Sequence, residues 1–413
     1  MSMMDEAARL DAADPLGGYR ERFALPEGVI YLDGNSLGAL PRATPARLEE
    51  VVRGEWGAGL IRSWNAAPDA GPGWIDLPQR IGAKIAPLIG AAAHEVIACD
   101  STSVNLFKLI AAALAMRPGR KVILSEPGNF PTDLYMIAGL EAQGLAVRRL
   151  APRDKLLDAL RNSGVALLLL THVHYRDGAV HDMAALTRAA REAGVLTLWD
   201  LSHSAGAVEL DLSGCGVDFA VGCGYKYLNG GPGAPAFAYV AERHHDALAQ
   251  PLTGWFGHAQ PFAFHDDYAP APGVNRLLAG TPHVLGLAAL EVGVDLIAGI
   301  GMERLAEKSR ALSAFFLRCL NAEGIALECV SPAEPTRRGS QLSFRHENAY
   351  ALSQALIARG VIGDFRAPDI LRLGFAPAYL RFADLAEAAR HLAEILRTGE
   401  WRQDRFKARA AVT

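Results

Sequence analysis

Two residues of opposite chemical character, Lys226 and Asp200, each follow a short apolar run. Residues 219–221 lead to the lysine through two glycines, and residues 195–199 lead directly to the aspartate, which His203 follows closely. The carboxyl ends of strands in an α/β sheet meet at one edge, where such folds bind their ligands. An amine that forms a Schiff base, with a carboxylate facing a pyridinium nitrogen, is typical of pyridoxal phosphate chemistry.

Hydroxyl side chains open a predicted helix upstream of both residues. Residues 96–99 predict a strand, and Thr102 and Ser103 precede the apolar periodicity of residues 104–116. Hydroxyls in this place either cap the helix or bind a phosphate, because unpaired N–H groups and the helix dipole favour an anion there. The phosphate interpretation requires the helix to begin at the same sheet edge as Lys226.

Strand and helix patterns alternate through the middle of the chain. Further strands are predicted at residues 122–124, 165–170 and 236–240, with helices beginning at 130–133 and covering 182–193. This alternation predicts an α/β fold with a mainly parallel sheet covered by helices.

A second, smaller set of elements occupies the C-terminal part. Helical patterns cover residues 285–321, 348–359 and 383–398, and strand patterns cover 325–327, 341–344 and 370–373. This mixture predicts a separate α+β domain. We therefore expect an N-terminal segment (1–50) that contributes to the active site and the small domain, a large cofactor-binding domain (51–290) and a small C-terminal domain (291–413).

The composition excludes several classes of function. The formal net charge of -4 over 413 residues predicts no nucleic-acid or membrane partner. The longest apolar run, residues 165–170, is too short to span a bilayer, and the acidic N-terminus does not resemble a secretory signal. The five cysteines lack metal-binding spacing and suit a reducing cytoplasm. His172 and His174 have no third ligand at regular spacing, so we expect no metal site.

Five segments spread over nearly the whole chain have distinctive sequences: YLDGNSLG (31–38), FPTD (130–133), WDLSHSAGA (199–207), VGCGYKYLNGGPGAP (221–235) and ILRLGFAPAYLRFAD (370–384). Together they resemble kynureninase, a family of pyridoxal-phosphate hydrolases within the aminotransferase class V-like group. The resemblance implies fold type I, with a sheet of the seven-stranded type. It also implies a homodimer with active sites at the subunit interface.

The resemblance implies a role for each matching residue. Lys226 is implied to be the Schiff-base lysine and Asp200 the partner of the pyridinium nitrogen, with Tyr225 a cofactor contact and our candidate proton donor. The other implied cofactor-binding residues are Thr102, Ser103, Phe130, Asp133, Thr171, His203, Trp255 and, from the neighbouring subunit, Thr281. Substrate binding is implied for Arg372, whose fork geometry suits a carboxylate, and for Ser36 and Trp64 at the aryl end.

The reaction implied by the resemblance is hydrolysis of L-kynurenine to anthranilate and L-alanine, within the kynurenine pathway of tryptophan catabolism and NAD biosynthesis. Whether 3-hydroxykynurenine, which gives 3-hydroxyanthranilate, is also a substrate stays open, because one ring hydroxyl is recognised by few side chains.

Other functions remain as alternatives. A class V aminotransferase shares the lysine and aspartate segments. A cysteine desulfurase needs a mobile cysteine, whereas Cys223 lies three residues before Lys226 at a presumed strand end. A non-catalytic binding protein of the same fold is disfavoured because Lys226 is present, and a lysine that only extends along the surface is the simplest competing explanation.

Overall fold

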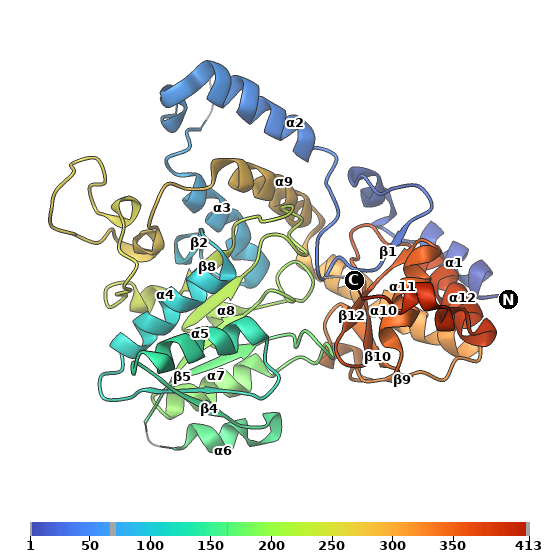
Figure 1. The fold of residues 1–413 in the computed structure, drawn as a ribbon. Helices are drawn as coiled ribbons and strands as arrows, with labels where there is room; N and C mark the ends of the chain where they lie inside the picture. Colours follow the sequence, from blue (N-terminus) through green and yellow to red (C-terminus); the bar gives the residue numbers. More distant parts are fainter. Residues whose placement is uncertain (1, 67–71, 163, 410–413) are drawn as a thin grey trace.

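A seven-stranded sheet forms the centre of the computed structural model, which describes residues 2–66, 72–162 and 164–409 (Figure 1). Its strands, in spatial order, are β2 (Val96–Ala98), β8 (Phe237–Val240), β7 (Phe219–Gly222), β6 (Leu196–Asp200), β5 (Val165–Thr171), β3 (Val122–Ser125) and β4 (Val147–Leu150). Strands β7, β6, β5, β3 and β4 are parallel, and β8 runs antiparallel to both of its neighbours. The predicted α/β fold with a mainly parallel sheet is confirmed.

Both faces of this sheet are apolar because its central strands are apolar at most positions. In β5, Leu168 and Leu170 belong to one hydrophobic cluster, whereas Leu167 and Leu169 belong to another, as the two-residue period of a strand requires. Helices cover the two faces: α3 (Leu77–Ile85), α4 (Thr102–Ala115), α5 (Pro131–Ala142), α6 (Leu156–Leu160), α7 (Met183–Glu192) and α8 (Leu212–Cys215).

A four-stranded antiparallel sheet organises the C-terminal part, shown in orange and red in Figure 1. Its strands, in spatial order, are β12 (Asp364–Arg366), β13 (Ile370–Gly374), β10 (Gln341–Arg345) and β9 (Glu328–Cys329). The helices of this part are α10 (Met302–Ala322), α11 (Ala349–Ala358) and α12 (Phe382–Thr398).

The N-terminal segment packs against this C-terminal part. Helix α1 (Met3–Ala12) contacts α12, and β1 (Ile30–Tyr31) pairs in parallel with β11 (Val361–Ile362). The chain then rises into α2 (Thr44–Glu49), which continues as a wider helix over Glu50–Gly59 at the top of Figure 1. Helix α9 (Val284–Ile300) packs against α2 and α3.

Two of the predicted C-terminal elements are wrong in detail. The helix expected over 285–321 is two helices, α9 and α10, because Gly301 adopts a φ of 91°, which L side chains rarely adopt. The strand expected at 325–327 is irregular, and pairing with β10 begins only at Glu328. Strand β4 was not predicted, since its sequence, V-R-R-L, carries two charges at the sheet edge.

Among the described residues, no single helix is long and apolar enough to cross a membrane. Helices α9 and α10 satisfy the length and composition criteria only as a pair, and they are bent by 81° where they meet.

Candidate active site

Strands β5, β6 and β7 end side by side and open onto a cavity of about 190 Å³. Thr171 ends β5 in register with Asp200 at the end of β6, and the chain beyond β7 carries Lys226. The cavity is lined by Thr102, Ser103, Phe130, Thr132, Asp133, Thr171, Tyr175, Asp200, Ser202, His203, Tyr225 and Lys226. The structure therefore brings together nine of the residues singled out in the sequence: Thr102, Ser103, Phe130, Asp133, Thr171, Asp200, His203, Tyr225 and Lys226.

The Lys226 amine is buried rather than extended along the surface, with only 7% of the residue exposed. Its Nζ lies 3.0 Å from His203 Nε2, and 5.7 Å and 5.8 Å from the ring centres of Phe130 and Tyr225. Burial lowers the pKa of Lys226 below its ordinary value. Burial, together with the charge of Lys226, also holds the pKa of His203 well below its usual range. A low lysine pKa favours the neutral amine, which is the nucleophilic form.

The Asp200 carboxylate is fixed at the base of the cavity. Its Oδ1 accepts a hydrogen bond of 2.7 Å from the backbone N–H of Ser202. Burial raises the pKa of Asp200, while the bonds from Ser202 and the charge of Lys226 oppose that rise. Burial and the nearby Asp200 also raise the pKa of Asp133. A cationic ring nitrogen placed beside Asp200 would offset this burial cost.

The start of α4 lies at the cavity, and neither of the two predicted hydroxyl residues is its N-cap. Ser101 is the N-cap, and its side chain accepts from the N–H of Val104 at 3.3 Å. Thr102 and Ser103 are thus free to line the cavity. Within the described residues, the buried Thr102 Oγ1 has no hydrogen-bond partner. A hydroxyl and free N–H groups at a helix start can bind a phosphate.

The turn in the YLDGNSLG segment (31–38) packs directly on the loop that carries Lys226. The N–H of Gly38 donates to the carbonyl oxygen of Tyr225 at 2.8 Å. A side chain at position 38 would collide with the carbonyl oxygen of Lys226, so this contact requires glycine. The same turn carries Ser36, whose Oγ accepts from Arg372 Nη2 at 2.8 Å.

Arg372 is not among the residues that line the cavity, but it contacts one of them. Its side chain is 1% exposed, and Nη1 donates to the carbonyl oxygen of the lining residue Tyr175 at 2.6 Å. Asp364 accepts from its Nε at 2.8 Å and from its Nη2. Ser36 therefore contacts the guanidinium group that the resemblance assigns to the substrate carboxylate.

Three predicted residues lie away from the cavity in this single chain. Trp64 packs on Trp74 and Phe256, with ring centres 5.8 Å apart in both pairs. Trp255 is 39% exposed, and Thr281 lines a different cavity, of about 270 Å³, with Pro235 and other residues. None of the three lines the Lys226 cavity of its own chain.

Three lining residues, Tyr175, Thr132 and Ser202, were not assigned a role from the sequence. The backbone N–H of Ser202 donates to Asp200 Oδ1. Tyr175 lies just beyond β5, and its ring packs edge-on against Phe130 with ring centres 5.3 Å apart. Thr132 lies in the first turn of α5. The signal available in the sequence was that Tyr175, Thr132 and Ser202 lie in the segments that follow strands β5, β3 and β6. By contrast, His172 contacts Ser204, so it is a buried hydrogen-bonding residue.

Cys223 is poorly suited to act as a mobile nucleophile. It follows the end of β7, is 4% exposed, and its Sγ donates to the carbonyl oxygen of Ser202 at 3.8 Å. Burial raises the pKa of the thiol, which disfavours the reactive thiolate.

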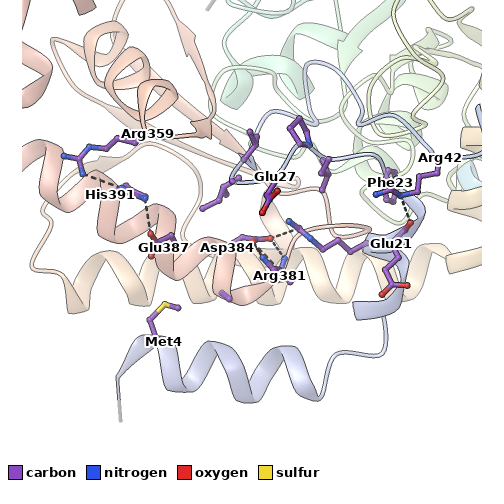
Figure 2. Close-up of a pocket in the computed structure, with 17 residues that line it drawn as sticks. Met4, Glu21, Phe23, Glu27, Arg42, Arg359, Arg381, Asp384, Glu387 and His391 are labelled. Carbon is purple, nitrogen blue, oxygen red and sulfur yellow. Dashed lines mark hydrogen bonds and ion pairs between the residues drawn. The ribbon is translucent and has the colours of Figure 1, made fainter. Parts of the chain in front are cut away.

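A larger groove, of about 680 Å³, lies between the N-terminal segment and α12 (Figure 2). We call it the α12 groove. Its buried carboxylate is paired: Asp384 accepts from Arg20 at 2.8 Å and from Arg381 at 2.7 Å, and Glu387 lies 3.0 Å from His391. None of the side chains drawn in Figure 2 has a buried polar atom without a hydrogen-bond partner.

Comparison with solved structures supports the fold. A cysteine desulfurase from Thermococcus onnurineus NA1 superposes with a TM-score of 0.77 at 19% identity, covering 92% of this chain and 98% of that one. A C-DES mutant with glycine covalently linked to its PLP cofactor gives a TM-score of 0.75 at 18% identity, covering 90% and 98%. At these identities the likeness establishes the fold alone.

Sequence comparison is far more specific. A kynureninase from Burkholderia mallei (strain SAVP1) is 51% identical over the full length of both chains, and one from Deinococcus radiodurans is 52% identical over 94% of this chain and 95% of its own. Residues 305–392 match the model of the kynureninase C-terminal domain. The chain therefore belongs to the kynureninase family.

Proposed function

We propose that this protein is a pyridoxal-phosphate-dependent hydrolase that cleaves L-kynurenine to anthranilate and L-alanine. The observation that carries the proposal is the 51% sequence identity to a kynureninase over the full length, in a chain whose buried Lys226 and Asp200 line one cavity.

The cavity fits pyridoxal phosphate chemically. The unpartnered Thr102 Oγ1 and the start of α4 suit its phosphate, and Asp200 suits its pyridine nitrogen. Lys226 supplies the amine to which its aldehyde binds, and the Phe130 ring next to that amine is placed for stacking. Asp133, Thr171 and His203 would complete the binding site. When bound, the cofactor supplies an electron sink for bonds at the substrate α-carbon.

Two of the proton transfers can be assigned to the protein's own residues. Lys226, whose pKa is lowered by burial, can take a proton from the substrate α-carbon. Burial raises the pKa of Tyr225, so its hydroxyl stays protonated at neutral pH and can donate a proton. We assign to Tyr225 the protonation of the carbon left after the carbon–carbon bond breaks. His203, held neutral at 3.0 Å from Lys226, orients the lysine amine.

We also propose that the active enzyme is a homodimer that functions in the cytoplasm. Trp255 and Thr281 lie outside the Lys226 cavity of their own chain, which a contribution from a neighbouring subunit would explain. Large apolar side chains are exposed on the two helical segments that follow α2, Glu50–Gly59 and Leu60–Trp64, and on the loop before α9: Trp56, Leu60, Ile61, Phe262 and Phe264. Such exposed apolar groups favour burial in an interface.

The proposed division into residues 1–50, 51–290 and 291–413 follows the two sheets. The first segment supplies both Ser36, which contacts Arg372, and β1, which pairs with β11 of the C-terminal part. This arrangement allows the N-terminal segment to link the substrate site to the small domain.

An assay of anthranilate release tests the proposed activity. Purified protein with pyridoxal phosphate and L-kynurenine should release fluorescent anthranilate without any keto-acid acceptor. Release only when a keto acid is added, or transamination without release, would instead indicate an aminotransferase. The same assay with 3-hydroxykynurenine determines which of the two substrates is preferred.

A further inference from the structure

Three residues that line the Lys226 cavity, Phe130, Asp133 and Thr171, come from two separate segments of the chain. Phe130 and Asp133 lie at the start of α5, which follows β3, whereas Thr171 ends β5. The paired residues of β3 and β5 extend only to Leu124 and Leu168. The sheet's own hydrogen bonds therefore stop before the cavity, and other contacts must hold the two segments together there.

Asn129 joins these two segments beyond the end of the strand pairing. Its side-chain Oδ1 accepts from the N–H of Phe130 at 2.9 Å, from the N–H of Thr171 at 3.2 Å, and from Thr171 Oγ1. Its Nδ2 donates to Ser125 Oγ at 3.1 Å and to Asp133 Oδ2 at 3.4 Å. Backbone N–H groups can only donate, so the amide oxygen must face them. One amide group thus contacts all three lining residues and the end of β3.

The contacts of Asn129 also determine which oxygen of Asp133 is free. Oδ2 of Asp133 lies near Asn129 Nδ2 and 3.3 Å from Thr171 Oγ1. Oδ1 is buried and has no hydrogen-bond partner within the described residues. Buried polar atoms without partners are uncommon and mark places where a ligand can bind. Asn129 and Thr171 therefore leave one oxygen of Asp133 for a ligand in the cavity.

The turn that carries Asn129 is itself held in place. Gly128 has a φ of 79°, which glycine adopts readily, and the N–H of Asn129 donates to the carbonyl oxygen of Glu126 at 3.3 Å. Two histidines from the segment after β5 contact this turn: His174 Nε2 lies 2.8 Å from the carbonyl oxygen of Gly128, and His181 Nε2 lies 2.7 Å from Glu126 Oε1. Asn129 is 1% exposed, so its amide is fixed on both the backbone and the side-chain side.

We propose that Asn129 is a positioning residue of the cofactor site, which holds Phe130, Asp133 and Thr171 in the arrangement that binds pyridoxal phosphate. Asn129 itself does not line the cavity, so it acts through these three residues. The assignment rests on the proposed function, in which the three residues bind the cofactor. Removing the amide leaves two buried N–H groups without an acceptor and disconnects the start of α5 from the end of β5.

The test measures pyridoxal phosphate affinity in Asn129→Ala, from the absorbance of bound cofactor as it is added to protein depleted of it. The Kd should rise about 10- to 100-fold, the range that loss of an orienting hydrogen-bond partner costs at metal sites. At saturating cofactor the KM for L-kynurenine should stay within about threefold of wild type, because Asn129 bonds to no residue that we assign to substrate binding.

Thr197→Ala is the matched control. Thr197 is also fully buried, and its Oγ1 donates to Asp218 Oδ2 at 3.0 Å and accepts from the N–H of Asp218 at 3.2 Å. It lies near the start of β6, whereas the cavity residue Asp200 ends that strand. Urea unfolding without cofactor should show a loss of stability in both variants, but only Asn129→Ala should lose cofactor affinity.

Two results would overturn the assignment: a Kd within about threefold of wild type in folded Asn129→Ala, or an equal loss of affinity in Thr197→Ala. If Asn129→Ala does not fold, Asn129→Asp keeps the size of the side chain but replaces the donor to Asp133 with a carboxyl group. A Kd within about threefold of wild type in that variant would also overturn the assignment. A wild type that binds no pyridoxal phosphate would refute the proposed function itself, whereas a wild type that binds it beside an unaffected variant would refute only the role of Asn129.

Discussion

The Lys226 cavity and the α12 groove differ in how far their polar groups are satisfied. The groove is larger, at about 680 Å³ against about 190 Å³, but none of its lining side chains has a buried polar atom without a partner. In the smaller cavity, Thr102 Oγ1 and Asp133 Oδ1 are buried without a partner among the described residues. An unpaired buried polar atom costs free energy that a ligand can recover. Unused hydrogen-bonding capacity, rather than volume, therefore identifies the functional site.

The largest expected effect comes from removing the amine of the Lys226 cavity. Lys226→Ala should reduce anthranilate release by about 10⁴-fold, because the cofactor attachment and the α-proton base are lost together. Anthranilate fluorescence measures the rate, and absorbance of bound cofactor shows whether its environment changes. Lys84→Ala is the control, since Lys84 forms only partly exposed ion pairs with Glu291 and Asp295. Comparable activity in the two variants would remove Lys226 from the mechanism.

A second prediction asks whether the Lys226 cavity is complete in one chain. If Thr281 acts in the neighbouring subunit, Lys226→Ala and Thr281→Ala proteins should each be impaired, yet should regain activity when their subunits are mixed. Random exchange gives hybrid dimers with one intact site, for about a quarter of wild-type activity. Sedimentation velocity verifies the dimer. No recovery, despite verified subunit exchange, would place Thr281 in its own chain's site or outside the site.

In the α12 groove, substitution should change stability and leave catalysis intact. Asp384→Asn breaks contacts with Arg20 and Arg381 around a carboxylate whose side chain is 4% exposed. The free energy of unfolding in urea should fall by about 1–3 kcal/mol, with kcat and KM within about twofold of wild type. Glu387→Gln, at a more exposed ion pair, should cost less than about 1 kcal/mol. A specific loss of activity in either variant would mean that the groove has a functional role.

The last prediction concerns the pH dependence of stability near the cavity. Burial, then the charge of Asp364, raises the pKa of Asp33 from 3.8 to about 8. The unfolded chain therefore releases this proton at lower pH than the folded chain, so the free energy of unfolding should decrease between about pH 4 and pH 8. Asp33→Asn should flatten that decrease in urea titrations. An unchanged slope would show that Asp33 is ionised in the folded protein.

The sequence predicted the centre of the cavity well because strand ends are local features. Apolar runs that end in Asp200 or lead through glycines to Lys226 indicate where a sheet edge lies, and a hydroxyl-rich helix start marks Thr102. The contacts of Arg366 were not predictable in this way. Strand β12 is three residues long and begins with a charge, and its contacts with Ser36 span 330 positions of sequence. The division between α9 and α10 was missed because a glycine in a helical pattern does not by itself reveal its φ.

The central claim is that Lys226 is the attachment point of the cofactor in this cavity. The direct measurement is to reduce the protein with borohydride in the presence of pyridoxal phosphate, digest it, and locate the modified lysine by mass spectrometry. We predict one pyridoxyl group on the peptide that contains Lys226, and none on that peptide in Lys226→Ala. A stoichiometric adduct on a different lysine, with Lys226 unmodified, would contradict the account.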